Sequence, residues 1–255
     1  MKQIKYLQDS LVSLRLVETS KKLPSLLEEA EKEQHSYIAF LNNVVEFERK
    51  MREEKNMEKR LKLASFPCIT PLEEFNLDEQ ESLSLKQFNQ LKELAWIEQL
   101  FNLILLGPPG VGKTHMAVGL GLEAIKRGYK VSFISMGDLV HTLKTMDITR
   151  KSQTRIKRIK ESHLVIIDDL MYAAMDPREA NLFFQLINDL YNNSSIILTS
   201  NRSPKEWTEL LGDVGVATAI LDRLIHRAEI VHFNDSSYRM KHRETIFKEE
   251  SVQNK

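Results

Sequence analysis

Residues 103–114 read LILLGPPGVGKT, an apolar run that enters a glycine-rich turn and then a helical pattern ending near Arg127. A buried strand, the pattern G-x-x-x-x-G-K-[ST] and a helix, in this order, are typical of a phosphate-binding loop. The glycines let the backbone approach a phosphate with its N–H groups turned inward, and the helix N-terminus adds positive potential. The stretch therefore predicts a nucleoside triphosphate site. The alternative is a structural glycine turn that holds no ligand.

The polar side chains of this loop have expected roles. Lys113 would reach the β- and γ-phosphates, and the hydroxyl of Thr114 would ligate Mg²⁺. We expect the nucleotide to contact the whole segment, which consists of Gly107, Pro108, Pro109, Gly110, Val111, Gly112, Lys113, Thr114 and His115.

The composition excludes several classes of protein. The chain of 255 residues carries 36 basic and 36 acidic side chains, so a nucleic-acid site would have to come from local clustering of charge. Cys68 is the single cysteine, which excludes an intramolecular disulfide and a cysteine-rich zinc site. The first residues, MKQIKYLQDS, lack the apolar core of a signal peptide, and no apolar stretch approaches the length of a membrane span. We expect a soluble, cytoplasmic protein.

Two prolines divide the chain. Residues 1–66 contain no glycine and repeat apolar residues at helical spacing, which predicts a small all-α N-terminal domain of three or four helices. Pro67 and Pro71 interrupt this pattern, so we expect a linker over 67–78 and a nucleotide-binding domain over 79–255.

Apolar runs alternate with helical patterns in the second domain. Strands are expected at 102–106, 130–135, 164–168, 195–200 and 229–233, and helices near 83–98, 113–127, 136–145, 152–161, 176–192, 204–211 and 216–227. This alternation predicts an α/β fold with a five-stranded parallel sheet flanked by helices.

Two carboxylates end the expected strand 164–168. In P-loop ATPases an acid at this position holds the Mg²⁺ that bridges the phosphates, so Asp168 is the candidate, acting mostly through water. Asp169 would then polarise the attacking water. A strand that simply ends in a solvated turn is the alternative.

The strand 195–200 ends in a polar tip with the sequence TSN at 199–201. An amide at this tip can orient the lytic water, which makes Asn201 the candidate and Thr199 a poorer one. Taken alone, the tripeptide is an ordinary strand-end turn.

Two arginines have expected catalytic roles. Arg223, on an amphipathic helix, would point toward a neighbouring subunit and neutralise γ-phosphate charge there in trans. An ion pair with Asp222 or Glu229 is the alternative for Arg223, and Arg227 is the second candidate for the trans role. Arg239, after the last strand, would fold back onto the γ-phosphate of its own subunit.

The motifs GPPGVGKTH, LVIIDDL, ILTSN, LDRLIHRAEIVHF and SYRMK follow one another in this chain. With them the chain resembles AAA+ P-loop ATPases of the IstB/DnaC clade, in particular the IstB helpers that insertion sequences encode beside their transposase. The resemblance implies ATP and Mg²⁺ as cofactors, ATP hydrolysis, a homo-oligomeric ring or spiral with ATP at the subunit interfaces, and duplex DNA and a transposase as partners in transposition. It also implies that Phe75 and Leu77 line the adenine side of the pocket.

The chain departs from the AAA+ pattern in two places. Asp169 stands where most AAA+ proteins carry glutamate, so we expect slow hydrolysis that DNA or the transposase stimulates. The segment after Phe233 is too short for a full helical lid domain, so we expect Arg239 to be carried by a short tail.

A basic segment lies between the second and third expected strands. Seven lysines and arginines stand against a single acid, Asp147, over residues 144–160. Such clustering in a neutral chain is typical of polyanion binding, and the lack of aromatic residues favours phosphate contact without sequence readout. The DNA-binding candidates are Lys144, Arg150, Lys151, Arg155, Lys157 and Arg158. A solvated helix face is the alternative.

These features leave four functions to compare. The chain could be an ATP-dependent DNA-remodelling partner of a transposase, a DnaC-like loader of a replicative helicase, or a nucleotide-gated clamp that barely hydrolyses ATP. Fold cannot separate the first two, because they differ only in the client protein. A small-molecule kinase is disfavoured, since no glycine-hinged lid stands between the relevant strands.

Overall fold

The computed structural model describes residues 2–77, 80, 82–170, 175–211, 213–233 and 238, with the side chains of 208–210 left out. The chain forms two compact units that divide between Lys59 and Arg60. This division falls inside a long helix, so residues 60–66 group with the second unit. The domain boundary expected at the prolines stays a prediction.

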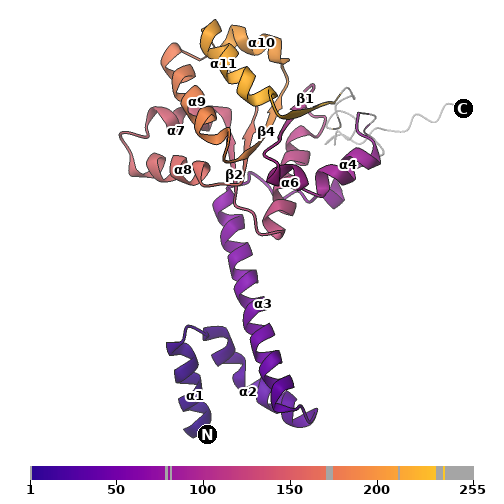
Figure 1. The fold of residues 1–255 in the computed structure, drawn as a ribbon, viewed down its shortest axis with the longest axis vertical. Coiled ribbons are helices and arrows are strands. Elements are labelled where there is room, and N and C mark those ends of the chain that lie inside the picture. The colour runs from indigo at the N-terminus through magenta and orange to yellow at the C-terminus, as the bar shows by residue number, and fades with distance from the viewer. Residues whose placement is uncertain are drawn as a thin grey trace, which may run out of the picture. The chain divides into compact units, whose positions relative to one another are not determined.

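The first unit consists of helices. These are α1 (Lys2–Ser13), α2 (Val17–Lys32) and the first part of α3 (Tyr37–Ala64), as Figure 1 shows. Polar contacts join them: Thr19 Oγ1 donates to the carboxylate of Glu48 at 2.5 Å, and Lys55 forms an ion pair with Glu18 at 2.7 Å. The predicted helical N-terminal region is confirmed.

The second unit is built on a sheet of five parallel strands. The strands are β1 (Asn102–Leu106), β2 (Val131–Ser135), β3 (Leu164–Asp168), β4 (Ser195–Ser200) and β5 (Ala228–His232). Their order is β2-β3-β4-β1-β5, and every neighbouring pair is parallel. The expected α/β fold with a five-stranded parallel sheet is therefore confirmed.

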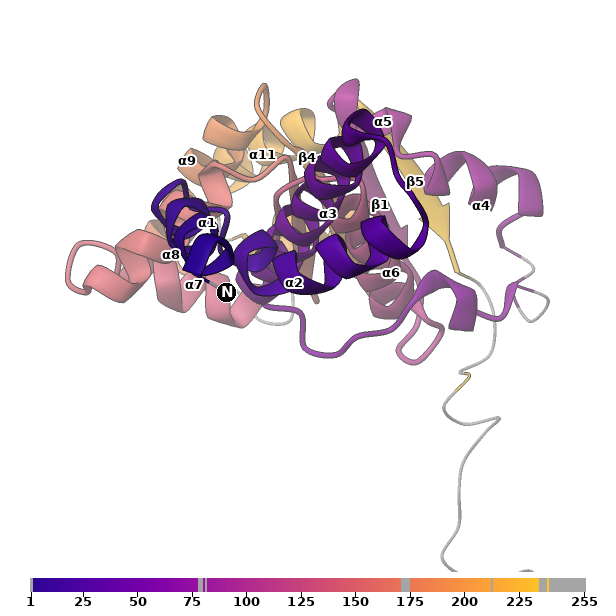
Figure 2. The same ribbon diagram turned by 90° about the horizontal axis from the view of Figure 1, so that it is seen from below.

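Helices cover both faces of this sheet (Figures 1 and 2). They are α4 (Leu85–Lys92), α5 (Ala95–Glu98), α6 (Lys113–Lys126), α7 (Met136–Lys144), α8 (Arg150–Lys160), α9 (Pro177–Leu190), α10 (Pro204–Leu210) and α11 (Val214–Ile225). The expected helix at 83–98 is two helices, because Leu94 between them is buried with a left-handed backbone (φ 58°).

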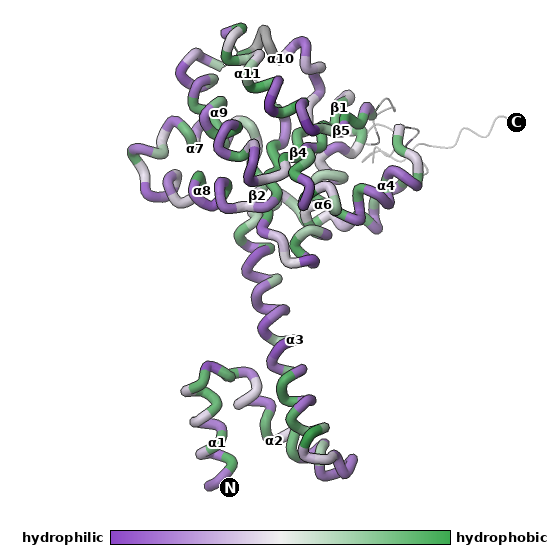
Figure 3. Tube along the Cα trace, in the orientation of Figure 1, coloured by the Kyte–Doolittle hydropathy of each residue, from purple (hydrophilic) through white to green (hydrophobic). Residues whose placement is uncertain are grey.

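Side chains of successive strand residues enter opposite core clusters. Ile104 and Leu106 of β1 pack with α7, α8, α9 and α11, whereas Leu103 and Leu105 pack with α4, α5 and α6. Figure 3 shows hydrophobic colour in the middle of this unit, around β1 and β4. This two-sided burial explains why β1, β3 and β4 contain apolar runs, whereas β5 at the sheet edge is only partly buried.

The segment before α4 lies along α6, where two glycines allow a close approach. It includes a short 3₁₀ helix, η1 (Leu72–Glu74). A Cβ atom at Gly119 would lie 2.5 Å from Cδ2 of Leu72, and one at Gly121 would lie 2.8 Å from Cζ of Phe66. The linker therefore passes against the helix that starts at the phosphate-binding loop.

None of the helices in the described part of the chain combines the length and the apolar character that crossing a membrane requires.

Candidate nucleotide site

The phosphate-binding loop connects β1 to α6 through three glycines with positive φ. Gly107, Gly110 and Gly112 have φ values of 151°, 85° and 95°. A Cβ atom at Gly107 would lie 2.3 Å from the carbonyl oxygen of Phe233, and one at Gly112 would lie 3.0 Å from the Phe75 ring. Both the backbone conformation and the space around it therefore require glycine at these positions.

Lys113, the first residue of α6, turns its ammonium group back onto the loop. Its Nζ atom donates hydrogen bonds to the carbonyl oxygens of Gly107 and Pro108, each at 2.8 Å. The residue is only 7% exposed. The ammonium group of Lys113 therefore lies at the glycine turn itself, within the loop expected to hold a phosphate.

Asp168, at the end of β3, is joined to the loop and to β4 by two hydroxyl groups. Its Oδ1 atom accepts from Thr114 Oγ1 at 2.9 Å and from Thr199 Oγ1 at 2.6 Å. Burial raises the pKa of this carboxyl group; the two hydroxyls and Lys113 lower it, and the neighbouring Asp169 raises it further. The predicted pair of Thr114 and Asp168 is thus in direct contact.

Asp169 lies at a bend immediately after β3. Its φ is 54°, which is uncommon for a residue other than glycine, and its side chain is exposed. The Asp169 N–H donates to Thr199 Oγ1 at 2.9 Å, and the Leu170 N–H donates to the Thr199 carbonyl at 2.8 Å. The bend is therefore held by hydrogen bonds from both residues to β4.

Thr199 is the residue whose importance the sequence analysis missed. It was considered only as a poorer candidate for orienting water, yet its fully buried hydroxyl links both acids. One signal in the sequence could have indicated this: Thr199 is a polar residue directly after the apolar run of 196–198.

Asn201 follows β4 directly and is exposed. Ser200, beside it, accepts a hydrogen bond on its carbonyl from the Gly107 N–H at 3.1 Å. The tip of β4 therefore lies next to the start of the phosphate-binding loop, and Asn201 is carried at that tip.

Phe75 and Leu77 lie on the linker side of the loop. The ring of Phe75 stacks on Phe88 with centroids 6.1 Å apart and meets His115 edge-on at 5.4 Å. Leu77 packs against the same core cluster. The linker thus reaches the loop, whereas the adenine-side role of these residues stays a prediction.

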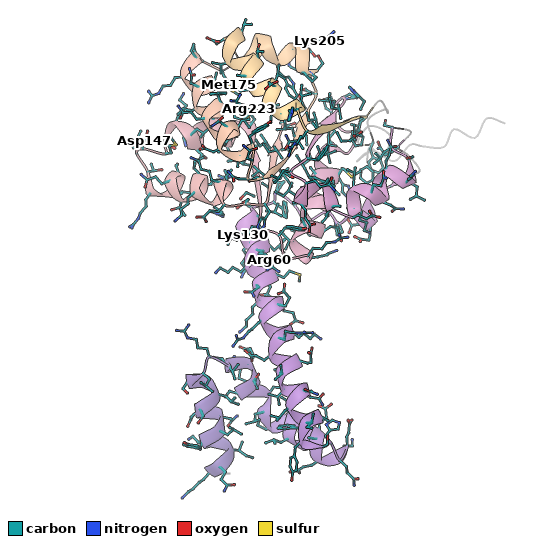
Figure 4. All side chains as sticks on the ribbon, viewed as in Figure 1. Arg60, Lys130, Asp147, Met175, Lys205 and Arg223 are labelled. Carbon is teal, nitrogen blue, oxygen red and sulfur yellow. The ribbon has the colours of Figure 1, made fainter. Side chains whose placement is uncertain are left out.

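Arg223 lies on α11, where that helix runs beside α9 (Figure 4). Its Nε atom donates to Asn188 Oδ1 at 3.2 Å, and its Nη1 atom donates to the Ala219 carbonyl at 2.9 Å. Its Cζ atom lies 4.8 Å from the centroid of the Phe184 ring. Within the described residues Arg223 forms no ion pair, so the alternative pairing with Asp222 or Glu229 is not found.

The chain returns to the loop after β5. The Tyr238 N–H donates to the Gly110 carbonyl at 3.0 Å. Arg239, the expected cis arginine, lies outside the described residues. Arg227, the second candidate for the trans role, is exposed at the end of α11, and its carbonyl accepts from the Asn102 N–H.

The six basic residues expected to bind DNA divide into two groups. Lys144 is paired with Glu179 at 2.8 Å, Lys157 lies 3.9 Å from Glu161, and Arg158 donates to the Leu63 carbonyl at 2.8 Å. The remaining three, Arg150, Lys151 and Arg155, have no ion-pair or hydrogen-bond partner for their side chains in the described part of the chain.

The three unpaired cations lie on α8, which is amphipathic. Ser152, Ile156 and Ile159 are its buried residues, whereas Lys151, Arg150 and Arg155 lie outside this buried set. The hydrophilic colour dominates this helix in Figure 3. The structure therefore brings the three cations together on α8, outside its buried residues.

The sequence comparisons name the family. A family model described as IstB-like ATP binding protein matches residues 9–246. The chain belongs to this family. An insertion sequence IS21 ATP-binding protein from Pseudomonas aeruginosa is 38% identical over 231 residues, covering 91% of this chain and 87% of that relative. An IS21-like ATP-binding protein from Bacteroides fragilis is 36% identical, covering 94% of this chain and 91% of its own length.

Solved structures agree with the AAA+ P-loop fold of this family member. AMPPCP-bound DnaA from Aquifex aeolicus is 27% identical with a TM-score of 0.55, and the match covers 69% of this chain. That match spans only 54% of the DnaA chain. The DnaC helicase loader, 24% identical over 62% of this chain and 96% of its own, has a TM-score of 0.50 and supports the fold alone.

Proposed function

We propose that this protein is an ATP-dependent, DNA-binding AAA+ ATPase that assembles on duplex DNA and assists the transposase of an insertion sequence in selecting its target. The observation that carries the ATPase part is the contact of Asp168 with Thr114 and Thr199 beside a glycine-dependent loop. The insertion-sequence part rests on the family and on the names of its relatives.

The residues present fit a magnesium-bound triphosphate. Gly107, Gly110 and Gly112 all have positive φ, a conformation that lets a loop turn its N–H groups toward a phosphate. A hydroxyl and a carboxylate oxygen are ligands that Mg²⁺ prefers, so Thr114 and Asp168 would hold the ion and Lys113 the phosphates. When bound, Mg²⁺ neutralises charge on the phosphates.

Hydrolysis needs a water molecule that is oriented and polarised. Asp169 is the proposed polarising group, because it is exposed at the bend that directly follows Asp168. Asn201, at the adjoining end of β4, is proposed to orient that water. The aspartate is one methylene shorter than glutamate, so we propose slow hydrolysis stimulated by DNA or the transposase.

Arg223 is proposed to complete the nucleotide site of a neighbouring subunit. Its guanidinium is held by neutral groups of α9 and α11 and keeps its charge available for a γ-phosphate. Such a residue is worth roughly 10³–10⁵ in rate in other phosphoryl-transfer systems. Assembly and nucleotide occupancy would then depend on each other.

DNA is proposed to contact the basic face of α8. The unpaired cations Arg150, Lys151 and Arg155 are the first candidates, because phosphate binding does not have to break an existing ion pair there. Lys144, Lys157 and Arg158 would contribute to the surrounding positive potential.

The test is the ATPase rate and the assembly size with and without duplex DNA. We expect DNA to raise both in the wild-type protein and Lys113→Ala to abolish both responses. A monomer at every nucleotide and DNA concentration would overturn the proposal. Parallel pull-downs with the transposase and with a replicative helicase separate the transposition role from the helicase-loader role.

A further inference from the structure

The contacts of Arg223 have a property that the trans role by itself does not require. The side-chain amide oxygen of Asn188, the carbonyl of Ala219 and the ring of Phe184 are all uncharged. A carboxylate in this place would cancel the positive charge of the guanidinium, whereas neutral acceptors and a ring orient it and leave the charge intact.

The acids that lie close to Arg223 and to Asn188 in the sequence form no ion pair with Arg223 in the described part of the chain. Asp189, the residue after Asn188, is paired with Lys160 at 2.7 Å. Asp222 accepts a hydrogen bond on its backbone carbonyl from the His226 N–H, and its side chain is exposed. The guanidinium of Arg223 therefore forms no ion pair among the described residues, although Asp189 and Asp222 are close to its contacts in the sequence.

One nitrogen of the guanidinium is left for another molecule. Nε and Nη1 are engaged, and Nη2 has no hydrogen-bond partner among the residues that the structure describes. Two hydrogen-bonded nitrogens and a ring whose centroid lies 4.8 Å from Cζ restrict the direction in which the third nitrogen can donate. Such preorganisation matters in catalysis because misplacing a charged group by about 1 Å can cost about 10²-fold in rate.

Phe184 and Asn188 are placed for this task by α9. They are four residues apart and so lie on one helix face, which runs beside α11. Phe184 is half-buried against the core cluster, while Asn188 is exposed at the surface. The ring of Phe184 is therefore held by the core. The amide of Asn188 lies at the surface, where it accepts a hydrogen bond from the guanidinium of Arg223.

We propose that Phe184 and Asn188 are positioning residues that aim Arg223 at the nucleotide bound to a second copy of this chain. The inference rests on the proposed trans role of Arg223 and adds to it: α9 of the donating subunit sets the catalytic rate of its neighbour. Phe184 supplies the ring over which the Cζ atom of Arg223 lies, and Asn188 accepts a hydrogen bond from its Nε atom.

Mixed assemblies test the two claims separately. Donor subunits carry Asp169→Asn, which removes their own hydrolysis and leaves Arg223 in place, and acceptor subunits carry Arg223→Ala with an intact loop. We expect an equal mixture with duplex DNA to hydrolyse ATP faster than either variant alone. If the mixture is no faster, the trans role of Arg223 fails and the positioning role fails with it.

Donors that additionally carry Asn188→Ala or Phe184→Leu test the positioning role. We expect the activity regained in the mixture to fall about tenfold or more in kcat, with KM and assembly size unchanged. Phe184→Tyr keeps the ring and should restore the rate. Asn181→Ala, on the same helix but bonded to the Pro177 carbonyl, is the matched control and should leave the rate unchanged.

Full activity with Asn188→Ala and Phe184→Leu donors, in mixtures where the unmodified donors do restore hydrolysis, would overturn the positioning role and leave the trans arginine standing. A fall in assembly size with an unchanged kcat per assembled subunit would also overturn it, because Phe184 and Asn188 would then be structural.

Discussion

The hydroxyl of Thr199 lies 2.6 Å from Oδ1 of Asp168 and 2.9 Å from the backbone nitrogen of Asp169. One side chain on β4 thus donates to the first carboxylate and accepts from the backbone of the second. Because β4 lies between β1 and β3 in the sheet, Thr199 connects the strand of the phosphate-binding loop with the strand of the acids.

Thr199→Val keeps the shape of the side chain, but it removes the hydroxyl and should therefore impair the nucleotide site. The substitution removes a hydrogen bond that lowers the pKa of Asp168 and deprives the part-buried Asp169 N–H of its acceptor. We expect a loss of about 1–3 kcal/mol in unfolding free energy and an ATPase rate lowered by about tenfold or more. Denaturant unfolding and steady-state hydrolysis measure the two effects.

Thr199→Ser is the control for this prediction, since it keeps the hydroxyl and should retain most of the activity. An unimpaired valine variant, or a serine variant as impaired as the valine variant, would contradict a role that the hydroxyl alone carries.

Asp168 should make the stability of the metal-free and nucleotide-free protein depend on pH. Burial raises the pKa of its carboxyl group above the ordinary 3.8, so the folded state binds the proton more tightly than the unfolded state does. Its stabilising contribution is fully present below the ordinary pKa and is lost as pH rises through the raised one. Asp168→Asn should thus unfold at a higher temperature than wild type at neutral pH.

The difference between Asp168→Asn and wild type should shrink as the pH is lowered through the raised pKa. Thermal unfolding in a chelating buffer over a series of pH values measures it. A constant difference across the series would contradict a buried, titrating Asp168.

Gly119→Ala should destabilise the second unit. The added Cβ atom would lie 2.5 Å from Cδ2 and 2.7 Å from Cγ of Leu72, so the linker would have to move away from α6. Overpacking of this kind costs about 1–3 kcal/mol. Denaturant unfolding provides the measurement, and weaker nucleotide binding should accompany the loss, because the linker also packs at the loop through Phe75.

Gly137→Ala is the matched control on α7, where nothing lies within 4 Å of the added atom. It should be neutral or stabilise the protein by up to about 1 kcal/mol, as expected for alanine in a helix. If both alanine variants gained stability, the close approach of Leu72 to α6 would be wrong.

Arg155→Ala should weaken duplex-DNA binding and reduce its dependence on salt. Loss of one phosphate contact lowers the slope of log K against log salt concentration by about 1. Lys160→Ala serves as the comparison on the same helix, because Lys160 is already paired with Asp189 at 2.7 Å. Fluorescence anisotropy at several salt concentrations gives the slope for each variant. If the two variants had identical slopes, Arg155 would not contact DNA.

Several elements could be predicted because their signals are local. β1, β3 and β4 begin and end where the apolar runs 102–106, 164–168 and 195–200 do. The glycines at 107, 110 and 112 indicate where the backbone of the loop has positive φ, and the structure has positive φ at all three. The break at Leu94 was missed, since no proline or glycine marks it and tertiary packing imposes the left-handed backbone there.

By itself the sequence determined the strands, the phosphate-binding loop and the identity of the two acids, because burial pattern, glycine positions and strand ends are properties of short segments. Only the tertiary structure decided which hydroxyl holds Asp168, which helix holds Arg223 and which glycines of α6 face the linker. Those contacts join residues 31 positions apart for Thr199 and Asp168, and 35 for Arg223 and Asn188. The physical reason is that such pairs are set by the order of strands in the sheet and the packing of helices on it, and no local pattern encodes them.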